Sequence, residues 1–172
     1  MRRHDLLDLH DALQHPGQVT AVDLQTEFED EEDLDLVTPV DGFLECVSTG
    51  SALLITGEFK TRCVQDCARC AGPIEVDVEF QIEEEFPVEG TPACYGNDDF
   101  ARVMPTDEPE PMFEGNQLMV ERLLRQGLWL NMPVQSLCEF GWDGPCPKAT
   151  DYHNNTEDEH PFAKLEKLKE AE

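Results

Sequence analysis

Basic residues are scarce in this chain. Its 172 residues include 12 Lys and Arg against 38 Asp and Glu, which gives a formal net charge of −26. A field of this sign repels phosphate backbones, so we expect no direct nucleic-acid binding through a broad basic face. The acidic surplus either attracts basic proteins or reflects adaptation to a salty medium with no partner involved.

Long apolar runs are absent as well. No stretch approaches the length of about 18 apolar residues that a membrane span requires, so no span is predicted. The opening residues 1–5 lead into a segment that already contains Asp and His, without the apolar stretch of a secretory signal. We therefore expect a cytoplasmic protein, and the length indicates one domain.

Motifs of hydrolytic and phosphate-handling enzymes are missing. The sequence has no Gly-x-Ser-x-Gly, no Gly-x-x-x-x-Gly-Lys and no His-Glu-x-x-His. Carboxylates are so abundant that no pair stands out as an acid and base. We predict a protein that is not an enzyme.

Two long strands are indicated by alternation in mid-chain. From residue 53 to 63, apolar residues and glycine share one face, and residues 74–83 alternate Ile, Val or Phe with Glu, Asp or Gln. Such alternation is typical of half-buried antiparallel strands. Asn116 resembles an N-cap, and the apolar spacing up to Leu130 predicts a helix that covers the sheet and stops near Pro133. The predicted fold class is α+β, with an antiparallel sheet, either open or barrel-like.

Other segments are less regular. Leucines in residues 6–13 predict a short helix before the breaker at His15-Pro16-Gly17, residues 19–24 suggest a strand, and residues 27–35 read as an acidic loop. Proline and glycine predict a long flexible loop over residues 87–115.

Four cysteines have a pattern that indicates metal binding. Cys67 and Cys70 are two residues apart in the connection between the two long strands, and Cys138 and Cys146 follow far downstream. A tetrahedral site of four sulfurs is what structural zinc prefers. We predict a cysteine knuckle that binds zinc and ties the C-terminal third of the chain to its middle. The seven-residue gap between Cys138 and Cys146 is wider than usual, and Cys63 or His153 are substitute ligands.

A redox role for Cys67 and Cys70 is the alternative. A Cys-x-x-Cys pair becomes reactive when its first sulfur lies at a helix N-terminus. Here a strand follows the pair, so the context of thioredoxin-like proteins is missing. For Cys63, and equally for Cys46 and Cys94, the plain interpretation is a small core residue.

The order of these landmarks resembles the YceD family, the large ribosomal RNA subunit accumulation proteins. The resemblance runs from about residue 40 to the C-terminus, and its motifs are Cys67-Ala68-Arg69-Cys70, Leu130-Asn131-Met132-Pro133, Leu137-Cys138, Gly144-Pro145-Cys146-Pro147 and Pro161-Phe162-Ala163-Lys164-Leu165. It implies a non-enzymatic factor needed for accumulation of large-subunit ribosomal RNA. Its partner would be a ribosomal protein or an assembly factor. Within one domain we distinguish residues 1–39 from a YceD-like part over residues 40–172.

This sequence departs from the family pattern at two positions. Trp142 and Ala149 stand where many members carry further cysteines. Either Cys138 supplies the fourth sulfur, or the site is degenerate and binds no metal.

Overall fold

The computed structural model describes residues 6–28, 34–96, 100–106, 110–144 and 146–147. These residues fall into two compact units. The first lies within residues 1–64 and 75–133, and the second within residues 65–74 and 134–172. The first unit contains the sheets and helices, and the second contains the cysteine cluster. The sequence-based division at residue 39 stays a prediction.

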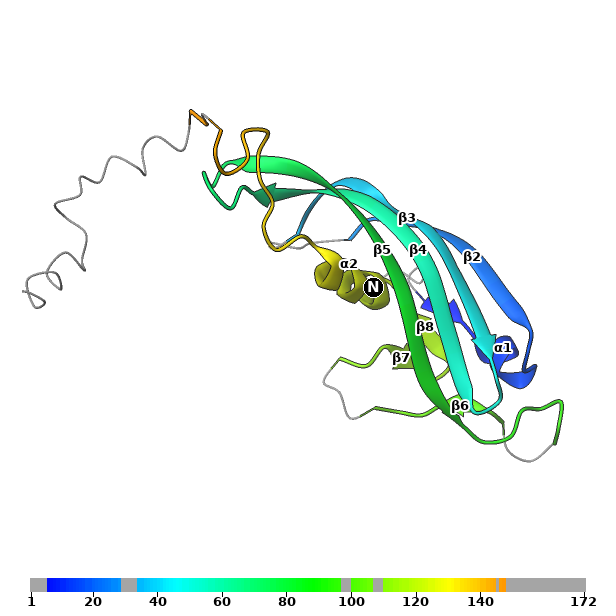
Figure 1. The fold of residues 1–172 in the computed structure, drawn as a ribbon. Helices are drawn as coiled ribbons and strands as arrows, with labels where there is room; N and C mark the ends of the chain where they lie inside the picture. The colour runs from blue at the N-terminus through cyan, green and yellow to red at the C-terminus, as the bar shows by residue number, and fades with distance from the viewer. Residues whose placement is uncertain (1–5, 29–33, 97–99, 107–109, 145, 148–172) are drawn as a thin grey trace, which may run out of the picture. The chain divides into compact units, whose positions relative to one another are not determined.

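The first unit is built on a curved five-stranded sheet (Figure 1). Its strands, in spatial order, are β2 (Val19–Thr26), β3 (Asp35–Ser48), β4 (Ala52–Asp66), β5 (Pro73–Glu89) and β6 (Arg102–Val103). The pairs β2–β3, β3–β4 and β5–β6 are antiparallel. Burial alternates along β4 and β5, as the sequence predicts for strands with one face on a core.

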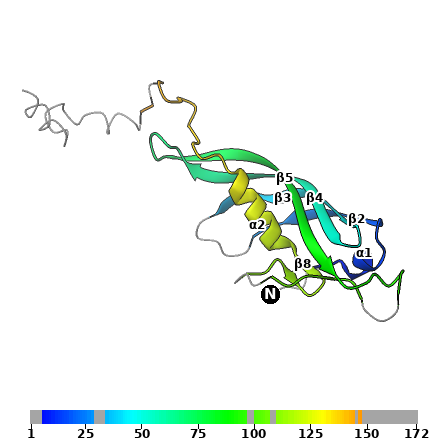
Figure 2. The same cartoon turned by 60° about the horizontal axis from the view of Figure 1, so that its bottom comes forward.

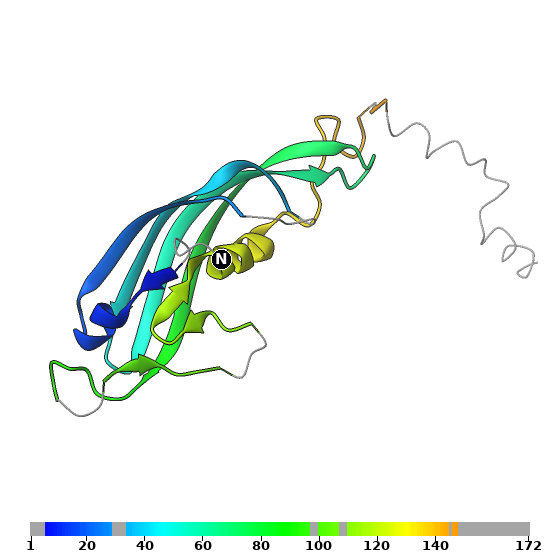
Figure 3. The same cartoon turned by 180° about the vertical axis from the view of Figure 1, so that it is seen from behind.

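A smaller sheet and two helices complete this unit. The small sheet has the order β1 (Leu6–Asp8), β8 (Gln117–Met119) and β7 (Phe113–Glu114), and the short helix α1 (His10–Gln14) follows β1. Helix α2 (Val120–Asn131) continues from β8 and buries one face. Figures 2 and 3 show α2, in yellow, against the concave face of the large sheet. Among the described residues, neither helix combines the length and the apolar content needed to cross a bilayer.

Aromatic packing over glycine fills the middle of the core. The rings of Phe59 and Phe80 stack with centroids 5.5 Å apart. Phe59 lies directly against the backbone at Gly42 and Gly57, and a Cβ on Gly42 would overlap the carbonyl oxygen of Glu58. Glycine at these positions lets the aromatic side chain approach the sheet closely.

The predicted α+β fold with an antiparallel sheet and a covering helix is confirmed, but three local predictions were wrong in part. Helix α2 begins at Val120 and not near Asn116, because residues 117–119 pair as β8. Asn116 does not cap the helix: its carbonyl accepts the Leu9 N–H at 3.0 Å, and its side-chain oxygen accepts the Val103 N–H at 3.3 Å.

The other two differences lie in the segments predicted as helix and loop. Residues 6–8 form β1, and only residues 10–14 are helical. The segment 87–115 contains the end of β5 together with β6 and β7, because its short extended pieces pair with neighbouring strands. In the acidic run, residues 29–33 lie outside the described residues, and Asp35 already belongs to β3.

Candidate metal centre

The Cys-x-x-Cys pair lies in a tight turn between β4 and β5. The N–H of Cys67 donates to the Gly72 carbonyl, and the N–H of Ala71 donates to the Cys67 carbonyl, both at 2.9 Å. Ala71 adopts a left-handed conformation with φ of 51°, which an alanine rarely does. The turn therefore holds the two cysteine side chains close together at the cost of one strained residue.

Backbone donors surround the Cys67 sulfur. The N–H groups of Cys70, Arg69 and Cys138 donate to it, and together they lower the pKa of the Cys67 thiol from 9.0 to about 6. The Cys138 nitrogen lies 3.3 Å from the Cys67 Sγ. Hydrogen bonds to the charged form of a thiol favour the thiolate, and a thiolate is the form that binds metal.

Cys70 lies in a different environment. The Gly72 N–H acts to lower the pKa of the Cys70 thiol, but burial and the neighbouring sulfurs of Cys67 and Cys146 outweigh it and raise this pKa to about 11. Several sulfurs packed together cannot all carry charge without compensation. A cation among them removes that repulsion and allows all of them to ionise.

A second chain segment joins the turn through backbone contacts. The Ala68 N–H donates to the Ser136 carbonyl at 2.8 Å, and the Ser136 hydroxyl donates to the Gln65 side-chain oxygen. Cys67, Cys70 and Cys146 form a buried cluster with partly buried Ile74, Leu137, Cys138 and Phe140 around it. The knuckle and the downstream segment are thus one packed body.

Arg69 binds the downstream loop through contacts that the sequence does not predict. Its guanidinium donates to the carbonyls of Gly141 and Gly144, both at 2.8 Å. The backbone N–H of the same residue also contributes to the lowered pKa of Cys67. An arginine inside a Cys-x-x-Cys, with glycines near the distant cysteines, was the only signal in the sequence.

The sulfur positions suit a tetrahedral metal ion. The Sγ atoms of Cys67, Cys70 and Cys138 all lie within 4.8 Å of one another. Four sulfurs bound to zinc at about 2.3 Å would lie about 3.8 Å apart, so a small contraction would bring these three to ligand distance. Cys146, only 3% exposed, lies in the same cluster and interacts with Cys70. This group could bind a metal such as zinc.

The remaining cysteines are elsewhere. Cys46 and Cys63 are fully buried among apolar residues of the large sheet, which confirms the plain interpretation for both. Cys94 is exposed and is therefore not the core residue we expected. Trp142 is about half exposed, and its side chain brings no ligand atom to the sulfurs. His153 and Ala149 lie outside the described residues.

The curved sheet, the covering helix and the buried cysteine cluster define a small acidic α+β protein with a candidate metal centre. The model of the family described as Large ribosomal RNA subunit accumulation protein YceD matches residues 55–169, which is more than half of the chain. The chain belongs to this family. Searches of curated proteins and of solved structures found no match.

Proposed function

We propose that this protein is a non-enzymatic factor in the biogenesis of the large ribosomal subunit, where it supports the accumulation of large-subunit ribosomal RNA. Membership of the YceD family is the observation that carries this proposal. The protein would act in the cytoplasm and through contacts with a ribosomal protein or an assembly factor, because its charge disfavours direct contact with RNA.

The outer face of the sheet is the surface best suited to a basic partner. The exposed acidic residues on β3, β4 and β5 include Asp41, Glu45, Glu58, Glu75, Asp77, Glu79, Glu83 and Glu85. The basic residues on the same strands are Lys60 and Arg62. A face with this balance attracts Lys and Arg side chains and steers their approach.

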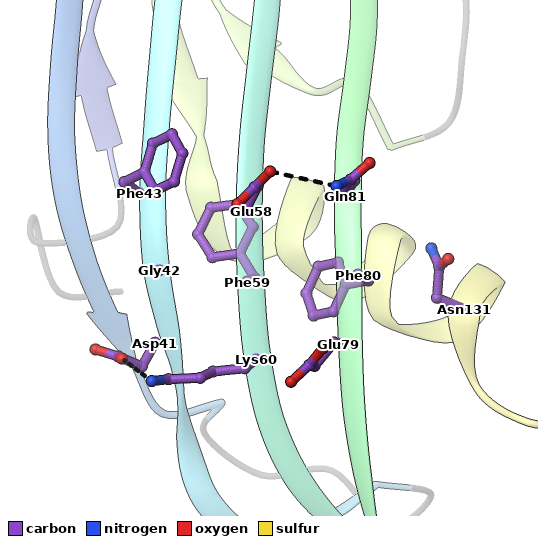
Figure 4. Close-up of a pocket in the computed structure, with 10 residues that line it drawn as sticks. All are labelled: Asp41, Gly42, Phe43, Glu58, Phe59, Lys60, Glu79, Phe80, Gln81 and Asn131. Carbon is purple, nitrogen blue, oxygen red and sulfur yellow. Dashed lines mark hydrogen bonds and ion pairs between the residues drawn. The ribbon is translucent and has the colours of Figure 1, made fainter.

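Internal ion pairs use only part of this negative charge. Arg62 binds Asp77 at 2.6 Å, which holds the pKa of Asp77 below its usual range, and Lys60 lies 3.6 Å from Asp41. A hollow of about 690 Å³ lies over β3–β5. Figure 4 shows the Asp41–Lys60 pair and the Glu58–Gln81 hydrogen bond among the residues that line it. Within the described residues, Glu79 forms no ion pair and is available to a partner.

Two measurements test this function. Deleting the protein should lower the level of large-subunit ribosomal RNA relative to small-subunit RNA. A pull-down with the full chain should recover large-subunit proteins at low salt and lose them as salt rises, because exposed charges are screened. If naked ribosomal RNA bound as tightly as any protein, contact through proteins would be the wrong mechanism.

We propose a structural role for zinc held by Cys67, Cys70, Cys138 and Cys146. The backbone donors at Cys67 and the packing of the sulfurs support this ligand set. A structural zinc ion would stabilise the fold of the second unit and would not take part in chemistry. Metal analysis of the purified protein should find about one zinc per chain. Loss of this zinc from a Cys67→Ser, Cys70→Ser double variant would support the assignment.

Thiol–disulfide exchange is the second candidate function. The lowered pKa of Cys67 beside the raised pKa of Cys70 favours it, because a reactive pair needs one thiolate. Against it, the two residues are only 2% and 8% exposed, so a substrate disulfide has no access. Thiol titration with and without chelator separates the two functions. Fast reaction of Cys67 in protein that never held zinc would favour redox chemistry.

A further inference from the structure

One long edge of the large sheet has no neighbouring strand over most of its length. Strand β5 spans 17 residues, but β6 pairs with it only at Val88 and Glu89. In the described part of the chain, no other strand lies beside β5 on that side. An unpaired edge presents a row of backbone donors and acceptors, which a strand from another protein can complete.

The hydrogen bonds at the end of β5 show which residues face this edge. The Val88 N–H donates to the Ser51 carbonyl on the side of β4. The Pro87 carbonyl accepts the Met104 N–H on the opposite side, where β6 lies. Exposure alternates without interruption from residue 75 to residue 88, so the strand contains no bulge that would shift this pattern. The odd-numbered residues Gln81, Glu83 and Glu85 therefore direct their N–H and C=O groups to the open edge.

A groove runs along the same edge on the helix side. It has a volume of about 350 Å³ and lies between β5 and α2. Ile82, Leu123 and Gly127 line it together with the carboxylate residue Glu84. Leu130 is 73% exposed at this groove and offers an apolar surface there. Alternate side chains of an added strand would enter this groove.

Gly127 allows the groove to form beside a closely packed helix. A Cβ at this position would lie 3.0 Å from the ring of Phe80 and 3.1 Å from Ile82. The helix thus approaches β5 at Gly127, while the surface of its next turn, with Leu130, stays accessible.

The charge along the edge selects the kind of strand that fits. Glu79, Glu83 and Glu85 are exposed on the outer face and form no ion pair within the described residues. A second copy of β5 would set carboxylates against carboxylates, which is destabilising. A strand with Lys or Arg at every second position would instead place its cations beside these acids.

We infer that the open edge of β5, from Glu79 to Glu85, binds an extended segment of a partner protein as an additional strand. Basic side chains of that segment lie along the acidic outer face, and the apolar side chains between them enter the groove beside Leu130. This inference rests on the proposed function for the class of partner and adds the surface and the binding mode.

A synthetic peptide tests the binding mode on the full chain. The peptide has about ten residues, a usual strand length, and alternates Lys with Val. We expect the Gln81→Pro variant to bind it about tenfold more weakly, because proline removes an outward N–H and crowds the edge without changing the charge. The matched control Gln81→Thr loses the same side-chain contact to Glu58 and should bind as tightly as the unaltered protein.

Amide hydrogen exchange in the unaltered protein gives a second readout, which does not depend on how the proline variant folds. The amides of Gln81 and Glu83 should exchange rapidly in the free protein and slowly with the peptide bound. A peptide methylated on its backbone nitrogens keeps its charges and should fail to protect them. Equal binding of both peptides and of both variants would overturn strand addition.

Other occupants of the edge would also overturn the inference. Protection of Gln81 and Glu83 that rises with protein concentration would show that a second copy binds there. Protection at every concentration without peptide would show that the chain covers its own edge. These peptide and exchange experiments test only the binding mode. The level of ribosomal RNA in a deletion strain tests the proposed function, so a failure of one proposal can be told from a failure of the other.

Discussion

Arg69 ties the turn of Cys67 and Cys70 to the downstream loop through two hydrogen bonds from its guanidinium to the carbonyls of Gly141 and Gly144. Charged donors form the stronger protein hydrogen bonds, so Arg69→Ala should weaken the closure of the downstream loop by about 1–2 kcal/mol. In the metal-free Arg69→Ala variant, alkylation of Cys146 should be about tenfold faster than in the metal-free unaltered protein. Arg102→Ala, which removes an exposed pair with Glu89, is the control and should leave this rate unchanged.

The pKa of Cys67 makes the metal-free protein sensitive to pH. Its folded pKa of about 6 lies below the ordinary value of 9.0, so its contribution to stability is complete above pH 9.0 and is lost as the pH falls to about 6. Cys70, with a folded pKa raised to about 11, acts oppositely and loses its contribution as the pH rises from 9.0 through 11. Stability from these thiols should therefore be greatest near pH 9.

Urea unfolding of reduced protein in chelator, repeated across this pH range, measures the effect. The Cys67→Ser variant should lack the rise in midpoint between about pH 6 and pH 9. A rise of equal size in this variant would show that other groups cause it.

At the scale of elements, the position of Phe59 over Gly42 sets how closely the core packs on the sheet. A Cβ at residue 42 would lie 2.5 Å from the Phe59 ring and would overlap a backbone carbonyl. Gly42→Ala should lower the free energy of unfolding by about 3 kcal/mol, since backbone cannot move aside cheaply. Gly96→Ala, where the nearest atom is 3.6 Å away, should change it by less than about 0.5 kcal/mol. Thermal or urea unfolding compares the two variants.

The long strands were predictable from the sequence because each buries one face. Alternation places Ile55, Phe59, Cys63, Phe80 and Ile82 in the core, and it fixes the faces of β4 and β5 before any partner is known. The start of α2 was not predictable in the same way. Residues 117–119 are compatible with either state, and the pairing of β8 with β1, more than a hundred residues earlier in the chain, decides between them.

At the scale of the whole molecule, the seven cysteines should report three levels of protection. Exposed Cys94 should react with a thiol reagent in native protein. Cys67, Cys70, Cys138 and Cys146 should react only after chelation. Cys46, fully buried and with its pKa raised to about 12 by burial, should react only on unfolding, as should Cys63. Mass spectrometry of labelled peptides gives the order, and simultaneous labelling of all seven cysteines would contradict these three levels of protection.

The sequence indicates which cysteines could form the candidate site, but not the hydrogen bonds that position them. Spacing indicates Cys67 and Cys70 as a pair, since two intervening residues fit a knuckle. Nothing in the sequence shows that the Cys138 N–H would donate to the Cys67 sulfur, or that Ser136 would meet Ala68. Such contacts depend on where the rest of the chain takes the downstream segment, and residue patterns do not encode that path.

The separation of 71 positions between Cys67 and Cys138 has a consequence for the protein as it is being synthesised. The first pair of cysteines leaves the ribosome well before the second, and at about 5–20 residues per second the delay is several seconds. During this interval the nascent chain offers an incomplete site whose thiols are open to oxidants. The entropic cost of closing a loop of this length falls once the intervening strands β5 to β8 and helix α2 have become compact. Capture of a metal ion by all four cysteines would then be a late event of folding, since it must wait until Cys138 and Cys146 have left the ribosome.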